Sequence, residues 1–146
     1  MSHIATVEIE IRDLDALKAA CARLGLEFRQ GQQQYKWFGR SVGNYPLPAG
    51  FTAAELGSCE HAIGIPGNKR AYELGVVARR DGRPGYVLMW DFYMGGYGLE
   101  AVVGKDCNAL RQAYATEVAK RKAIQQGFRV QERKLSNGSV QLVCSK

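Results

Sequence analysis

The chain has 146 residues, a formal net charge of +6, and a composition of 46% hydrophobic and 23% charged residues. This length suits one domain and supplies enough apolar side chains for a core without metal ions or disulfides. The composition excludes an intrinsically disordered chain, and no apolar run approaches the roughly 20 residues that cross a membrane. We therefore expect residues 1–146 to form a single domain with no membrane partner.

The first predicted elements are a strand and a helix. Apolar and polar side chains alternate over residues 6–11, a period of two that predicts a strand with one buried face. Asp13 has the side chain of a helix N-cap, and leucines at helical spacing follow over residues 14–24. Gly25 is placed to end this helix.

The next part of the chain alternates short strands with turns. Residues 26–28 and 35–38 are predicted as two strands around a glutamine-rich turn. Glycine and proline interrupt every pattern over residues 39–57, which predicts a long irregular loop. A short strand over residues 62–65 follows.

Two longer strands, over residues 72–80 and 85–93, form a predicted central hairpin. They flank Asp81-Gly82-Arg83-Pro84, a sequence of typical turn residues.

The C-terminal third is predicted as a helix and a second hairpin. Asp106 or Asn108 caps the helix, which ends before Gly127. The hairpin covers residues 128–145, and its Asn137–Gly138 turn predicts type I′ geometry.

These elements predict an α+β fold, in which an antiparallel sheet carries two helices on one face. The order strand-helix-strand-strand occurs twice, which indicates either a duplicated unit or only the common helix-glycine-strand ending. The second face of the sheet is then expected to stay partly open to solvent or to a partner.

Basic residues cluster at three places, and the central hairpin is the first candidate binding surface. Its arginines are Arg79, Arg80 and Arg83, with further clusters at residues 69–70 and 120–122. Such clusters form a docking stripe for an acidic partner or nucleic acid if the fold brings them together, and otherwise a solvated surface.

A second candidate site is the aromatic and glycine-rich segment of residues 89–98. Trp90, Asp91, Tyr93 and Tyr97 could border a ligand or stack on a base, or they could be core residues followed by a turn. The glycines match neither a P-loop nor a dinucleotide-binding fingerprint, so we expect no cofactor.

The long C-terminal helix carries a third candidate site. Glu117 and Arg121 fall within its apolar stripe beside Tyr114, four positions apart and in the order that favours an ion pair. The pair is either a structural contact or the mouth of a cleft between this helix and the sheet.

The four cysteines are scattered and show no C-x-x-C pair, which favours reduced thiols and a reducing compartment. Cys59 and His61 stand two apart. They could contribute to a metal site or to nucleophilic catalysis, but the remaining groups for either are not near them in sequence. We therefore assign no catalytic residue and no metal.

Several segments together resemble the family of hypothetical chloroplast reading frames, which also occurs in cyanobacteria, other bacteria and phages. The similar segments are residues 1–4, 11–17, 72–77, 85–87, 90–91, 110–115, 127–130 and 137–138. The stretch around residues 44–51 departs from the family. The resemblance implies a fold and a small accessory role, and it brings no established activity, catalytic residue or cofactor.

The leading hypothesis is a non-catalytic accessory protein, of phage origin by that analogy, which binds a macromolecule through the open sheet face or the central hairpin. A protein partner ranks slightly before nucleic acid. The alternative is a small-molecule pocket or enzyme site formed by Trp90, Asp91, Tyr114, Glu117 and Arg121. No secretory signal is visible at the N-terminus, so a cytoplasmic location is expected, in a bacterial host if a phage encodes the chain.

Overall fold

The computed structural model describes residues 3–39 and 46–146, and it has an α+β architecture. The elements in chain order are β1 (Ile4–Ile11), α1 (Leu14–Arg23), β2 (Glu27–Gln30), β3 (His61–Gly64), β4 (Leu74–Ala78), β5 (Tyr86–Asp91), α2 (Leu99–Val103), α3 (Asn108–Gln125), β6 (Arg129–Lys134) and β7 (Val140–Ser145). Short 3₁₀ segments lie at η1 (Ala53–Glu55), η2 (Tyr93–Gly98) and η3 (Lys105–Cys107). Within the described ranges, no helix is both long enough and apolar enough to cross a membrane.

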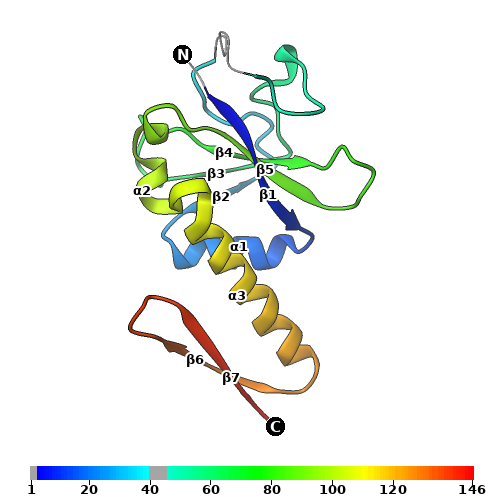
Figure 1. Ribbon diagram of the computed structural model, residues 1–146, viewed down its shortest axis with the longest axis vertical. Coiled ribbons are helices and arrows are strands. Elements are labelled where there is room, and N and C mark those ends of the chain that lie inside the picture. Colours follow the sequence, from blue (N-terminus) through cyan, green and yellow to red (C-terminus); the bar gives the residue numbers. More distant parts are fainter. Residues whose placement is uncertain (1–2, 40–45) are drawn as a thin grey trace.

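The strands form two separate sheets. Five strands pair antiparallel in the order β1-β5-β4-β3-β2, whereas β6 and β7 pair only with each other. Figure 1 shows the large sheet toward one end of the long axis and the β6–β7 hairpin at the opposite end, joined by α3.

The predicted first strand and helix are confirmed. Oδ1 of Asp13 accepts a hydrogen bond from the backbone N–H of Ala16 at 2.9 Å, which satisfies one of the amides left unpaired at the start of α1. Gly25 follows the helix with a φ of 70°, a conformation that glycine adopts without a steric penalty.

One face of the large sheet is covered by all three helices, as Figure 1 shows. Leu17 of α1, Leu99 of α2 and Leu110 of α3 are fully buried in one core cluster with strand residues such as Val76 and Leu88. This confirms the predicted packing of helices on one face of an antiparallel sheet. The short helix α2 was not predicted, because five residues are too few to show helical periodicity.

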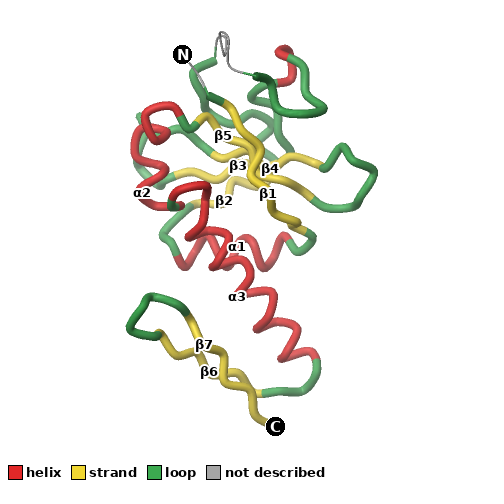
Figure 2. Tube along the Cα trace, viewed as in Figure 1, coloured by secondary structure: helices red, strands yellow, loops and turns green. Residues whose placement is uncertain are grey.

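The opposite face is not open, which corrects the prediction. Tyr35, Leu56 and Cys59 are buried there against Val77 and Met89 of the sheet. Figure 2 shows that this covering layer is built mostly from loop rather than from helix or strand. The reason lies in β4 and β5, whose side chains are apolar on both sides, so exposing either face would leave a large apolar area in water.

The covering layer explains two further differences from the sequence prediction. Residues 35–38 form no strand, because β2 pairs with β3 and the chain after it crosses the sheet instead. Of the predicted irregular loop at residues 39–57, residues 40–45 lie outside the described ranges. The described remainder includes η1, and its Phe51 packs against the buried cluster.

The start of α3 also differs from the prediction. Neither Asp106 nor Asn108 caps it; the N-cap is Cys107, whose φ is 58° and whose side chain forms no capping hydrogen bond. Cys107 is the last residue of η3, and its side chain is fully buried in the helix-side core. It is therefore not available to cap the helix.

The C-terminal hairpin is confirmed, but its turn is not type I′. Of the pair Asn137 and Gly138, only Gly138 has a positive φ, at 87°. Type I′ turns need positive φ at both central positions. The hairpin also stays outside the large sheet, whereas β2 joins it, so the two strand-helix-strand-strand segments are not equivalent in space.

The covering layer can be tested at Gly75. A Cβ added there would overlap Cδ1 of Tyr35, so Gly75→Ala forces the ring off the sheet. We expect the free energy of unfolding, measured by urea denaturation, to fall by about 1–3 kcal/mol through overpacking.

The Tyr35→Ala background serves as the control. With the ring removed, Gly75→Ala should cost far less than in the parent chain, a coupling that a double-mutant cycle measures. Strictly additive effects of the two substitutions would contradict the contact.

Candidate nucleic-acid interface

The arginines of the central hairpin are largely neutralised by carboxylates beside them. Nη2 of Arg79 lies 2.6 Å from Oδ2 of Asp81, and Nη2 of Arg83 lies 2.8 Å from the same oxygen. Arg80 forms an ion pair with Glu55. Hydrogen bonds from Arg79 and then from Arg83 hold the pKa of Asp81 well below its ordinary range. Two carboxylates therefore offset most of the positive charge predicted to form a docking stripe.

Trp90 and Asp91 lie inside the protein rather than at a site surface. Oδ1 of Asp91 accepts hydrogen bonds from the backbone N–H groups of His3 at 3.0 Å and Tyr93 at 3.1 Å. Its Oδ2 accepts one from the N–H of Phe38 at 3.2 Å. The fully buried carboxylate thus joins three chain segments, a structural role that satisfies the buried group.

Tyr93 precedes an unusual left-handed turn, and Tyr97 is its last residue. Residues 94–97 have φ values of 52°, 64°, 63° and 54°, and left-handed backbone costs about 1–2 kcal/mol for each residue other than glycine. The ring of Tyr97 packs on that of Tyr72, with centroids 5.0 Å apart, whereas Tyr93 packs on His3 at 5.6 Å. The two tyrosines therefore meet different partners and form no shared stacking platform.

Tyr114 connects α3 to the start of α1. Its hydroxyl oxygen accepts hydrogen bonds from the backbone N–H groups of Arg12 at 3.0 Å and Asp13 at 3.2 Å. The side chain is buried, so the contact holds the β1–α1 junction against the long helix.

Glu117 and Arg121 belong to a wider ion-pair network. Oε1 of Glu117 lies 2.8 Å from Nε of Arg23 on α1, and Oε2 lies 4.0 Å from Nε of Arg121. Arg23 also pairs with Glu132 on β6, whose Oε1 lies 3.3 Å from Nζ of Lys120. The stronger partner of Glu117 is thus Arg23. Sequence reasoning missed it because the two residues are 94 positions apart and no local pattern links them.

The five residues of the predicted pocket do not share one cavity. Trp90 lines a cavity of 480 Å³, Tyr114 lines a second, and Glu117 with Arg121 lines a third, while Asp91 is fully buried. The geometry gives no support to a small-molecule site built from this set.

Cys59 and His61 have separate structural contacts. Sγ of Cys59 donates to the carbonyl of Gln32 at 3.2 Å, and Nδ1 of His61 accepts from the N–H of Gly31 at 2.9 Å. Burial raises the pKa of the Cys59 thiol to about 12, so the nucleophilic thiolate is scarce at neutral pH. Among the side chains that the structure describes, no three His, Cys, Asp or Glu residues cluster as metal ligands.

The positive charge of the chain is concentrated in its last 30 residues. We call residues 117–146, the second half of α3 with the β6–β7 hairpin, the C-terminal arm. The arm holds seven Lys or Arg and two Asp or Glu, a net charge of +5, and the preceding 116 residues account for the remaining +1. The sequence shows this asymmetry directly, but the candidate sites were chosen from local clusters and overlooked it.

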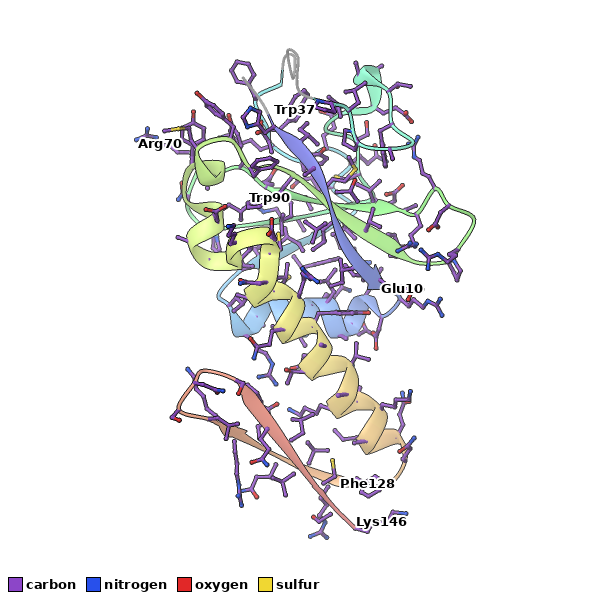
Figure 3. The ribbon with its side chains drawn as sticks, in the orientation of Figure 1. Glu10, Trp37, Arg70, Trp90, Phe128 and Lys146 are labelled. Carbon is purple, nitrogen blue, oxygen red and sulfur yellow. The ribbon has the colours of Figure 1, made fainter. Side chains whose placement is uncertain are left out.

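The basic side chains of the arm differ in their availability. Five of them form no ion pair within 4.0 Å among the described residues: Lys122, Arg129, Arg133, Lys134 and Lys146. All five are exposed. Figure 3 places Phe128 and Lys146 at the far end of the arm, away from Trp37 and Trp90 in the large-sheet part of the molecule.

No family model matches the chain, and neither a curated protein nor a solved structure matches it.

The role assigned to Tyr114 can be tested by removing its hydroxyl. In Tyr114→Phe, two backbone N–H groups are left without their acceptor, and we expect the free energy of unfolding to fall by about 1–3 kcal/mol. Tyr97→Phe is the comparison, because that side chain is 41% exposed and should change stability by less than about 0.5 kcal/mol. Equal effects in denaturant titrations would argue against the structural role.

Proposed function

We propose that the chain is a non-catalytic accessory protein that binds nucleic acid through its C-terminal arm. The observation that carries this proposal is the segregation of charge: nearly all of the excess positive charge lies on 30 residues at one end of the molecule. Basic residues concentrated on one element are the usual basis of attraction to a phosphate backbone.

The covered sheet supports the arm as the docking element. Because helices occupy one face and residues of 35–38 and 51–59 cover the other, a partner gains little by approaching either face. The arm, in contrast, presents both edges of a two-stranded hairpin and a series of exposed cations.

The chemistry of the arm favours nucleic acid over a protein partner. The energetic centres of protein interfaces are enriched in tryptophan, tyrosine and arginine, and the exposed large apolar residues of the arm are Ile124 and Leu135. Phe128 is the one aromatic residue of the arm, and the ammonium of Lys146 lies 5.0 Å from its ring centroid. An accessory role agrees with what the resemblance to the chloroplast reading-frame family implies.

A charge-reversal experiment tests the proposal. In the triple variant Lys122→Glu, Lys134→Glu and Lys146→Glu, nucleic-acid affinity at low salt should fall steeply, since each reversed cation removes both attraction to a phosphate and the release of a counterion. Fluorescence anisotropy with labelled oligonucleotides measures the affinity. The slope of log K against log salt should decrease by about 0.9 for each duplex phosphate that the variant no longer neutralises.

The matched control reverses three exposed cations outside the arm, Lys69→Glu, Arg70→Glu and Lys105→Glu. Each triple replaces three positive charges with three negative ones and lowers the formal net charge from +6 to zero. We expect the control to keep most of its affinity. Equal losses in both triples would contradict a specific role of the arm, and absence of any binding by the parent chain at low salt would contradict the function itself.

A further inference from the structure

The two faces of the β6–β7 ribbon differ in what they contact. The register pairs Arg129 with Ser145 at one end and Lys134 with Val140 at the other. Directly paired residues lie on the same face, and every second residue along each strand lies on that face too. Glu132 bonds Arg23 of α1 and Lys120 of α3, and its face is therefore turned toward the helices. This inner face holds Val130, Glu132, Lys134, Val140, Leu142 and Cys144.

The opposite face is turned away from the helices and is rich in arginine and glutamine. It holds Arg129, Gln131, Arg133, Gln141, Val143 and Ser145. Every member except the half-buried Val143 is exposed. This outer face has no acidic residue to compete for its guanidinium groups.

Arginine and glutamine are the side chains that recognise bases by paired hydrogen bonds. A guanidinium donates two hydrogen bonds to O6 and N7 of guanine, and a glutamine amide donates to N7 and accepts from the amino group of adenine. A surface that only attracts phosphates needs positive charge but no glutamine. The presence of Gln131 and Gln141 beside the arginines therefore favours base recognition over simple phosphate attraction.

The dimensions of the ribbon suit a DNA groove. The major groove of B-form DNA is about 12 Å wide and admits a two-stranded β-ribbon. Neighbours on one face of a strand are about 6.8 Å apart, and successive bases on one DNA strand are about 3.4 Å apart. Arg129, Gln131 and Arg133 can therefore face base pairs at roughly every second position.

We propose that the outer face of the β6–β7 ribbon enters the major groove of duplex DNA and reads base edges with Arg129, Gln131, Arg133 and Gln141. This inference rests on the proposed nucleic-acid function and specifies its ligand. Lys122 and Lys146 lie outside the outer face and contact the phosphates beside the groove, whereas Lys134 is on the inner face and adds only longer-range attraction.

Duplex DNA fits the ribbon better than other nucleic acids. Proteins that bind single strands stack bases on aromatic side chains, and the outer face has none. Double-stranded RNA has a deep and narrow major groove that side chains do not read.

The ion-pair network fixes the orientation that this binding mode needs. Arg23 pairs with Glu117 of α3 and with Glu132 of β6, so α1 holds the inner face of the ribbon from the side opposite the DNA. The pKa of Glu132 is lowered, chiefly by the hydrogen bond from Arg23, so this carboxylate stays charged to a lower pH than an ordinary glutamate.

The test selects binding sites from DNA duplexes with a randomised central stretch, using the full-length chain, and sequences the bound fraction. We expect a short preferred sequence that contains guanine and adenine. In Arg133→Lys the charge is kept but the planar fork is removed, so discrimination at one guanine position should fall roughly ten- to a hundredfold. Gln131→Ala should relax an adenine position in the same way.

The control Lys122→Ala should weaken binding to all sequences alike and leave the preferred sequence unchanged. Circular dichroism confirms that each variant is folded. Binding to duplex DNA, duplex RNA and single strands is also compared, and the DNA duplex should bind at least about tenfold more tightly.

The outcomes separate the two proposals. Salt-sensitive binding without a preferred sequence, or a preference that Arg133→Lys leaves intact, would overturn groove reading while the nucleic-acid function stands. Equal affinity for DNA and RNA duplexes would also overturn it. If no nucleic acid binds at low salt, both proposals fail, and an acidic protein becomes the partner class to examine.

Discussion

A sheet whose strands are apolar on both sides must be covered twice, and the rest of this molecule is arranged around that requirement. Val76 and Val77 are adjacent in β4 and point to opposite faces, yet both are buried. The helices supply one cover, and residues of 35–38 and 51–59 supply the other. Because both faces of the sheet are covered by its own chain, surface for a partner has to come from elements outside it.

Sequence reasoning succeeded where structure is set by nearby residues. The strand over β1, the Asp13 cap and the glycine that ends α1 follow from side-chain period and backbone preference within a few positions. The covering layer could not be foreseen in this way. Tyr35 is buried against Gly75, forty positions away, and no local pattern states which face of which strand an irregular segment will cross.

The same distinction explains the candidate sites. Sequence clusters identify charged and aromatic residues but not their partners. Arg79 and Arg83 are predicted to be available, although both pair with Asp81, which offsets one of their two positive charges. Asp91 was grouped with tyrosines as a ligand-binding residue, whereas its oxygens are satisfied by backbone amides. The concentration of positive charge in residues 117–146, in contrast, can be read from the sequence alone.

The attachment of the hairpin has a consequence for how related chains could diverge. Among the described residues, neither core cluster includes a member of β6 or β7, and the ion pairs between the ribbon and the helices come from Glu132 on its inner face. Exchanges on the outer face therefore leave the folding of the remaining chain untouched. Such an arrangement lets natural selection alter the side chains of the outer face while the scaffold that carries them stays constant.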